Sequence, residues 1–225
     1  IDEAYNQIKN LKDQNKSKIL VSDIMVLYAE LALKMQAKRI ILDAVNELEK
    51  AINSSQISQS DLPKAYMLMV DLKLEVNKTD DAKYFAQIII DNFDDEKIKT
   101  YGKISMAKVY KYQKDYQKAI KYLFEILTTT KNKNIATLVA DELFDLYVLE
   151  GKNEKANELI TQVLKNNMEF YTNDSYLANR KINRLIKAGM PDHAVEILTE
   201  LLKKATKDEV IEDFKFKLAN TYMLL

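Results

Sequence analysis

Few residues in this chain could carry out proton transfer. The chain has one histidine, His193, and carboxylates such as Asp141 and Asp145 that are spaced one helical turn apart. Two carboxylates on one helix face could act as acid and base, but the same spacing is typical of an exposed helix face. His193 follows Asp192 in the expected first turn of a helix, where a solvated histidine is common. We predict that the protein is not an enzyme; an enzyme would need Asp141 and Asp145 to face an enclosed pocket.

The sequence does not indicate a metal or cofactor site either. It has no cysteine and no second histidine, so neither a thiolate metal site nor a nucleophile–base pair can be assembled. The acidic residues Asp91, Asp94, Asp95 and Glu96 lack the alternating oxygens and the turn glycine of a calcium loop. No glycine-rich phosphate loop occurs. We therefore expect no catalytic residue, metal or cofactor, and we interpret the acidic run as a polar connection.

The stretch 101–127 shows the kind of secondary structure that the chain is built from. Its sequence, YGKISMAKVYKYQKDYQKAIKYLFEIL, has apolar residues at helical spacing on both sides of a polar segment at 111–115. Two short amphipathic helices of this kind are unstable alone, so they must pack against each other and against neighbouring pairs. The pattern predicts a pair of helices joined by a polar elbow.

The same helix pair recurs along the chain. A small residue in the second helix repeats every 37 or 38 residues, as Ala44, Ala82, Ala119, Ala156 and Ala194. This period predicts an all-α fold, a right-handed α-solenoid of about twelve helices. We expect one solenoid domain over 1–225, with a half repeat at 1–20, five repeats at about 21–57, 58–97, 98–134, 135–172 and 173–207, and a half repeat at 208–225. The half repeats suggest part of a longer array.

These repeats resemble the tetratricopeptide repeat. In that family the first helix reads W-x-x-L-G-x-x-Y and the second reads A-x-x-x-F-x-x-A. The third repeat offers Lys103, Met106, Ala107 and Tyr110, then Ala119, Leu123 and Ile126, and the fourth offers Ala140, Leu143, Phe144, Tyr147, Ala156, Ile160 and Val163. The family tryptophan, glycine and closing proline are absent, and the period exceeds the family value of about 34 residues. The resemblance implies that first helices line a concave side and second helices the outside.

Composition and charge fit a helical protein with a protein partner. The chain has only 3 glycines and 2 prolines, and Gly151 and Gly189 fall where a first helix should end. Its 34 basic and 34 acidic residues are interleaved, which argues against a nucleic-acid stripe or a membrane-surface helix. No apolar run is long enough to cross a bilayer. Short polar loops are expected at 53–61, 91–97, 128–134 and 166–170.

A solenoid of this type offers a continuous inner surface to a partner. The inward positions of the family fall on Tyr101, Lys108, Lys111 and Tyr112 in the third repeat, Leu138, Asp141 and Asp145 in the fourth, and Tyr176, Asn179 and Asn183 in the fifth. Tyrosines among charges of both signs suit a protein partner, although solvated positions without a ligand have the same composition. The lysine and asparagine pattern by which some family members clamp a C-terminal carboxylate is not reproduced.

Two segments match the pattern acidic-x-Asn-x-Ser/Thr. They span 13–17 and 75–79, and they place Asn15 and Asn77 in expected loops as candidate glycosylation sites. The pattern resembles the extended acceptor sequence of bacterial periplasmic N-glycosylation, although a chain rich in Lys, Asn and Ile also matches such motifs by composition. We expect a periplasmic location, with the cytoplasm as the alternative.

The repeat style, the Lys-, Asn- and Ile-rich composition, the lack of cysteine and the two acceptor patterns resemble a class of periplasmic flagellar-motor scaffolds, the paralysed-flagellum protein A class. This resemblance implies a non-enzymatic scaffold that helps to recruit or position stator units and is needed for motility. It also implies paralysed-flagellum protein B, or another motor component, as a partner. A cytoplasmic tetratricopeptide regulator or adaptor that binds a peptide or protein is the alternative.

Overall fold

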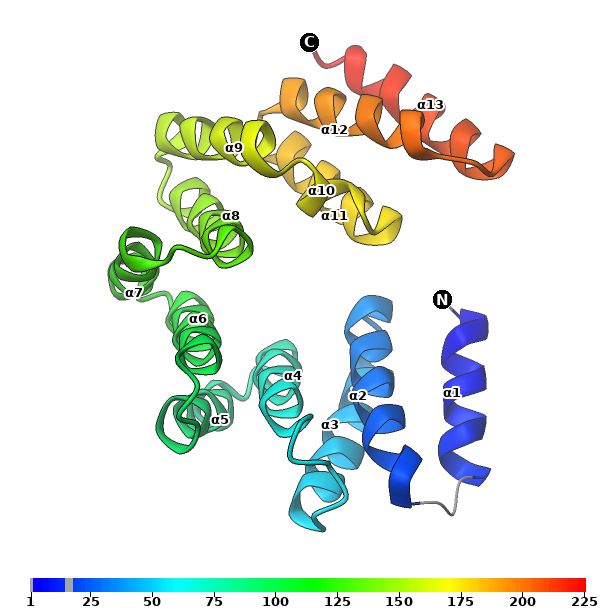
Figure 1. The fold of residues 1–225 in the computed structure, drawn as a ribbon. Coiled ribbons are helices and arrows are strands. Elements are labelled where there is room, and N and C mark those ends of the chain that lie inside the picture. The colour runs from blue at the N-terminus through cyan, green and yellow to red at the C-terminus, as the bar shows by residue number, and fades with distance from the viewer. Residues whose placement is uncertain (1, 15–17) are drawn as a thin grey trace. The chain divides into compact units, whose positions relative to one another are not determined.

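The computed structural model describes residues 2–14 and 18–225, and every regular element in that part of the chain is a helix (Figure 1). The thirteen helices there are α1 (Asp2–Gln14), α2 (Lys18–Met35), α3 (Lys38–Asn53), α4 (Leu62–Glu75), α5 (Thr79–Asn92), α6 (Glu96–Tyr112), α7 (Tyr116–Thr129), α8 (Lys133–Leu149), α9 (Asn153–Asn167), α10 (Glu169–Thr172), α11 (Ser175–Lys187), α12 (Pro191–Lys204) and α13 (Asp208–Tyr222). The predicted all-α repeat fold is confirmed. Among these helices none is both long and apolar enough to span a bilayer.

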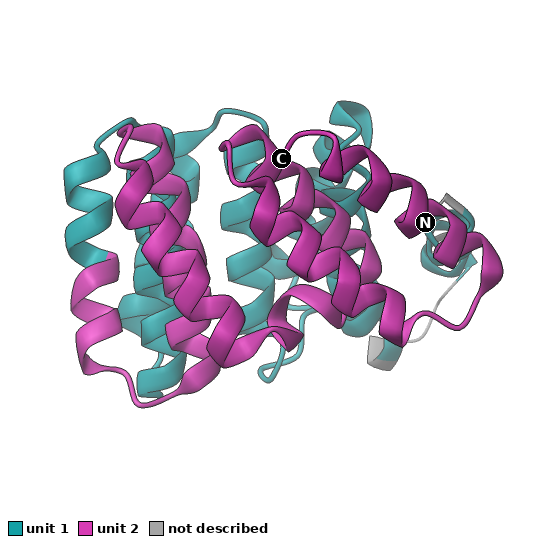
Figure 2. Cartoon of the chain, turned by 90° about the horizontal axis from the view of Figure 1, so that it is seen from above, with its two compact units in different colours: residues 1–122 teal, residues 123–225 magenta. Residues whose placement is uncertain are grey.

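The backbone packs as two compact units, Ile1–Tyr122 and Leu123–Leu225, with the boundary inside α7 (Figure 2). In the first unit α2 contacts α4, and α4 contacts α6, so the first helices of successive pairs lie side by side. Helices α3 and α5 pack against them as a second layer (Figure 1). In the second unit α8 packs on α9, α11 on α12, and α12 on α13.

Small side chains allow the helices of each pair to approach closely. The repeating alanines are all fully buried, as their spacing predicts: Ala44, Ala82, Ala119, Ala156 and Ala194. Larger apolar residues surround them, such as Leu48 and Met69 in the first unit and Phe144 and Ile182 in the second. Each such side chain contributes about 1.5–3 kcal/mol when it leaves water. In the second unit these residues belong to one continuous apolar core.

Gly102 lies at a close helix approach between successive pairs. It is buried on α6 against α5, where a Cβ atom would come within 2.9 Å of Ile89 Cγ2 and within 3.0 Å of Ile90 Cγ1. A larger residue would push α6 away from α5, because both neighbours are branched and packed. This glycine is needed for its small size.

A single residue with left-handed backbone ends the first helix of each pair. These residues are Gln36, Asn77, Lys114, Gly151 and Gly189, with φ between 54° and 75°. At the last four, the next amide donates to the carbonyl oxygen five residues earlier, at 2.8–3.0 Å. This is the Schellman arrangement, which satisfies carbonyl groups at a helix end. The predicted glycine elbows are confirmed, and three further elbows use residues other than glycine.

One expected loop is wrong, because part of 166–170 is helical. Helix α9 continues to Asn167, and α10 begins at Glu169. The reason is the burial of Tyr171, whose side chain is fully enclosed in the apolar core of the second unit. This burial stabilises a single helical turn that would be marginal in water.

The elbows predict the direction of two substitutions. Lys114→Gly should raise the free energy of unfolding by about 0.5 kcal/mol, because a left-handed residue other than glycine costs about 1–2 kcal/mol and glycine adds back some unfolded-state freedom. Gly151→Ala should lower it by about 1 kcal/mol, since nothing lies within 4 Å of the new Cβ and only backbone strain changes. Urea unfolding measures both.

The matched control is Lys121→Gly, an exposed lysine inside α7. It should lower the free energy of unfolding by up to about 1 kcal/mol, the usual cost of glycine within a helix. Destabilisation by Lys114→Gly of the same size would contradict the account of the elbow.

Candidate protein-binding surface

The predicted residues of the third repeat form one row on α6. Tyr101, Lys108 and Tyr112 are spaced by seven and four residues, which places them on a common face of the helix. Lys111 is half-buried next to this row. Helix α6 starts where it does because the Asp95 carboxylate accepts hydrogen bonds from the amides of residues 97 and 98.

Side-chain pairs join the row on α6 to the equivalent rows on α4 and α2. The pairs across neighbouring first helices are Lys64–Glu30 at 2.7 Å, Lys108–Asp71 at 2.9 Å and Tyr112–Glu75 at 3.4 Å. Two of them join residues 37 positions apart, so they follow the repeat itself. Exposed ion pairs contribute at most about 1 kcal/mol each. Their main effect is to fix the alignment of α2, α4 and α6 relative to one another. We call the polar surface of these three helices the platform.

Two tyrosines belong to this row on α6, and they differ in exposure. Tyr112 is 42% exposed, and its hydroxyl donates to Glu75. Partial burial and the nearby Glu75 carboxylate raise the pKa of Tyr112 above its ordinary value. Tyr101 is half-buried, and its hydroxyl makes no hydrogen bond within the described residues. We define the α6 surface as Tyr101, Lys108, Lys111 and Tyr112.

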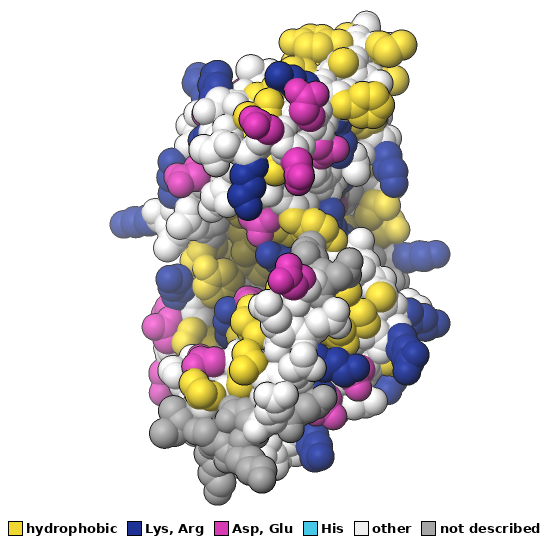
Figure 3. Space-filling model, turned by 90° about the vertical axis from the view of Figure 1, so that its right-hand side faces the viewer, with side chains coloured by type: hydrophobic (Ala, Val, Ile, Leu, Met, Phe, Trp, Pro, Cys, Tyr) yellow, Lys and Arg dark blue, Asp and Glu magenta, His cyan; other side chains and the backbone are white. Residues whose placement is uncertain are grey.

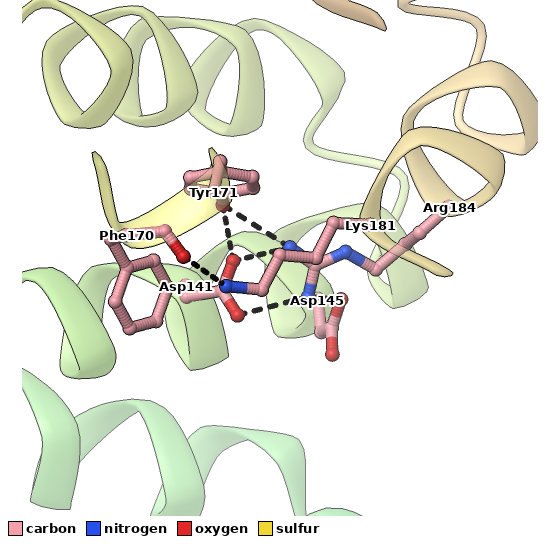
Figure 4. A network of polar contacts seen from close by, with 6 residues as sticks. All are labelled: Asp141, Asp145, Phe170, Tyr171, Lys181 and Arg184. Carbon is pink, nitrogen blue, oxygen red and sulfur yellow. Dashed lines mark hydrogen bonds and ion pairs between the residues drawn. The ribbon is translucent and has the colours of Figure 1, made fainter. Parts of the chain in front are cut away.

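Two of the predicted residues of the fourth repeat, Asp141 and Asp145, lie in a polar cluster inside the second unit (Figure 4). Asp141 and Asp145 project from α8, and Arg184 reaches them from α11. The Arg184 guanidinium donates to Asp141 and lies 3.0 Å from Asp145 Oδ1. Tyr171 of α10 donates to Asp141 and accepts from Arg184 Nη2 at 3.2 Å. The cluster therefore ties three helices together.

The prediction that Asp141 faces a partner is corrected by this cluster. Asp141 is only 8% exposed, because its carboxylate is needed to neutralise Arg184. Asp145, half-buried, is bridged to the same guanidinium, so the two carboxylates are held by a permanent cation. Leu138, the third inward position, is half-buried on α8. The pair that resembled an acid and a base is explained by packing between helices.

The cluster shifts the pKa values of Asp141 and Tyr171 in opposite directions. Burial alone would raise the pKa of Asp141, but the Arg184 guanidinium and the Tyr171 hydroxyl outweigh it and hold the pKa of Asp141 below its ordinary 3.8. The resulting stabilisation is present above about pH 4 and is lost as the pH falls through the lowered pKa. Burial and the adjacent Asp141 raise the pKa of Tyr171. The phenol therefore stays protonated as the donor.

Lys181 is a second cation at the edge of this cluster. Its Nζ donates to the Phe170 carbonyl oxygen at 2.9 Å and lies 3.4 Å from the centre of the Phe170 ring. Burial, together with the positive charge of Arg184, lowers the pKa of Lys181 to about 8. The unfolded chain therefore binds more protons than the folded chain between about pH 8 and 10.5, so this lysine alone makes stability rise with pH in that range.

The predicted residues of the fifth repeat are spread along α11. The helix starts at an Asp174 carboxylate that accepts from the amides of residues 176 and 177. Tyr176 and Asn179 are half-buried, and Asn179 accepts a hydrogen bond from Lys217 Nζ of α13 at 2.8 Å. Asn183 is exposed. Of this group, Asn183 is the residue best placed to meet a partner.

The other candidate residues have local roles. His193 Nε2 lies 2.8 Å from Asn157 Oδ1, so it links α12 to α9. Among the described residues no group of three or more His, Asp or Glu side chains could hold a metal ion. Asn77 is exposed at the elbow between α4 and α5, with φ of 60°. Asn15 lies outside the described residues.

Sequence reasoning missed Arg184, Tyr171 and Lys181. One signal was present, since the chain has only three arginines among its 34 basic residues and Arg184 lies between Ile182 and Leu185 on the apolar side of its helix. Arginine is the preferred cation for a buried carboxylate because its planar donors match two oxygens. Its partner is 43 residues away, and no local pattern predicts that pairing.

The fold belongs to a known class of helical-repeat structures. The chain resembles the crystal structure of TTC0263, a thermophilic tetratricopeptide-repeat protein in Thermus thermophilus, with a TM-score of 0.52. The two chains are 16% identical, and the match covers 88% of this chain and 99% of the other. The similarity establishes a tetratricopeptide-like fold. No family model and no curated protein matches the sequence.

The cluster around Arg184 predicts a large loss of stability on breaking one pair. Arg184→Met should lower the free energy of unfolding by about 3–5 kcal/mol, because Asp141 would remain buried without its cation. The double variant Arg184→Met/Asp141→Leu should recover most of that loss, since apolar groups can replace a buried ion pair. Urea unfolding at pH 7 measures both.

Arg180→Met on the same helix provides the control, because Arg180 is exposed. Its effect should stay within about 0.5 kcal/mol. Equal effects of Arg180→Met and Arg184→Met would show that the cluster does not stabilise the second unit.

Proposed function

We propose that the protein is a non-enzymatic scaffold that binds another protein through the α6 surface. The observation that carries this proposal is the pair of tyrosines on one face of α6, exposed Tyr112 and half-buried Tyr101, beside charged residues of both signs. Tyrosine is enriched among the residues that dominate binding energy at protein interfaces, and surrounding charges form the rim. A tetratricopeptide-like fold supports the proposal because its stacked first helices present such faces.

The side-chain pairs that involve α6 favour a protein over a small molecule as the ligand. Lys108 is bonded to Asp71, and Tyr112 to Glu75, so the platform is organised before a partner arrives. A surface that is already ordered loses little conformational freedom on binding. Charges of both signs occur on the platform itself, where Lys108 pairs with Asp71. Acidic and basic side chains are also both present on the face shown in Figure 3. A surface with charges of both signs favours a partner whose charges are complementary at each position, and it fixes the alignment of the two proteins.

We also propose a periplasmic location and a role in the flagellar motor, in which the chain helps to recruit or position stator units. The support is the sequence resemblance to periplasmic motor scaffolds, the lack of cysteine and the acceptor patterns at Asn15 and Asn77. The exposure of Asn77 at an elbow would give a glycan room without disturbing either helix. Paralysed-flagellum protein B is the proposed partner.

The binding proposal predicts the effect of one double substitution. Tyr101→Ala/Tyr112→Ala should weaken binding to paralysed-flagellum protein B by about tenfold or more, since removing aromatic anchors costs about 2 kcal/mol or more. Isothermal titration with the two purified proteins measures the change. In cells, the same variant should assemble flagella that are weakly driven or still.

Tyr84→Ala is the matched control, since Tyr84 is a 64% exposed tyrosine on α5, a second helix of the same unit. It should leave both affinity and motility unchanged. Wild-type binding that persists in the folded double variant would refute the α6 surface. If wild-type protein does not bind this partner at all, the motor role fails, and a cytoplasmic adaptor becomes the better proposal.

The compartment proposal predicts a modified Asn77. Protein purified from its native cells should carry a glycan mass that Asn77→Gly removes, and intact-mass spectrometry measures it. Glycine is the suitable replacement because it adopts the left-handed backbone of this elbow without strain. A single unmodified mass for the native protein would remove this support for the periplasm.

A further inference from the structure

The second unit has a crevice between α8 and α9 that the proposed function does not use. Its volume is about 170 Å³. Ala136 and Ala140 of α8 form one wall, Leu159 and Val163 of α9 form the other, and Leu127 of α7 closes one side. Ala140 and Val163 are buried, so the lower parts of the two walls form the floor. The two alanines create the space, because any larger side chain there would fill it.

The rim of the crevice carries polar side chains without partners. Lys133, Gln162 and Asn166 are exposed, and none of the three side chains makes a hydrogen bond to the described residues. By contrast, the Thr137 hydroxyl is satisfied, since it donates to a backbone oxygen and accepts from Asn167 Nδ2 at 2.9 Å. The rim therefore offers free donors above an apolar floor.

The size of the crevice limits what can enter it. A cavity of about 150 Å³ lined by apolar residues takes up a benzene-sized molecule, so this space suits a single leucine, isoleucine or phenylalanine side chain. It is too small to enclose a drug-sized ligand, which needs about 300 Å³ or more. An apolar side chain attached to a partner protein fits these limits.

The charge of the rim limits which partner residues can flank the inserted apolar side chain. Lys133 is the only charged residue among those lining the crevice, and no carboxylate lies among the lining residues that the structure describes. Lys133 is also the first residue of α8, where the helix dipole adds to its positive field. Acidic residues beside the inserted side chain would therefore be attracted, and basic ones repelled.

We propose that this crevice binds one aliphatic side chain of a partner protein, at a segment where acidic residues flank that side chain. The apolar floor holds the side chain, while Lys133 and the amides of Gln162 and Asn166 donate to the flanking carboxylates. The site uses residues distinct from the α6 surface. The proposal rests on the proposed function only in that the ligand is a protein segment.

Three blocked peptides and the full chain test the proposal. The peptides are acetyl-Ala-Asp-Leu-Glu-Ala-amide, its neutral analogue acetyl-Ala-Asn-Leu-Gln-Ala-amide, and acetyl-Ala-Asp-Ala-Glu-Ala-amide, which lacks the aliphatic side chain. Methyl NMR should show the acidic leucine peptide shifting the signals of Ala136, Ala140 and Val163 at millimolar concentrations. The neutral peptide should bind about two- to fivefold more weakly, as expected for one exposed ion pair. The alanine peptide should cause no shift.

Two variants and one control locate the binding. Ala136→Leu should fill the crevice and abolish the shifts, whereas Ala219→Leu, at an exposed alanine of α13, should leave them unchanged. Lys133 is exposed, so Lys133→Gln should not disturb the packing of the core. This variant should bind the acidic and the neutral leucine peptides with equal affinity.

Shifts that are absent at millimolar peptide, or that persist in Ala136→Leu, would overturn the proposal. So would an equal response to the leucine and alanine peptides. Failure here is separate from failure of the α6 surface, because the Tyr101→Ala/Tyr112→Ala variant keeps the crevice and should still respond to the peptide. If that variant loses its partner but still binds the peptide, the two sites are independent.

Discussion

The helices in the described part of the chain are too short to be stable alone in water, and the rest of the structure depends on that constraint. A helix of thirteen to eighteen residues is marginal in water, so each one must bury its stripe against neighbours before and after it. Fully buried alanines such as Ala119 and Ala156 let paired helices approach closely. Gly102 permits the same approach between successive pairs. Stability is therefore shared by nearest neighbours, as in other repeat proteins.

Close packing also decides what happens to the polar groups between helices. Where the first helices of the first unit meet, Lys108 and Asp71 pair at the surface and remain partly hydrated. Where α8, α10 and α11 meet, Asp141 and Arg184 are enclosed and need several hydrogen bonds to offset lost hydration. Charged groups between helices thus form a partly hydrated surface pair in the first unit and an enclosed network in the second.

The residues that recur with the repeat made the fold predictable from the sequence. The backbone conformation or the burial of some individual residues could not be predicted in this way. The alanine period and the elbow at Gly151 are local signals, and both describe the structure correctly. The elbow at Lys114 was not predictable, because lysine rarely adopts a left-handed backbone and only the packing of both helices enforces it. Burial of Asp141 was equally hidden, since its partner lies 43 residues away. The right-handed path and the repeat limits stay predictions, as do the location and the motor role.

The repeated elbow has a consequence for how the chain acquires its structure. Each Schellman bond joins residues five positions apart, and each helix pair closes within about forty residues, so most contacts are local in sequence. Local contacts require little loop closure and form quickly. A hairpin such as α4–α5 can therefore assemble as soon as it leaves the ribosome, before later helices are made. Synthesis itself would then order the assembly, with each finished hairpin providing the surface on which the next one docks.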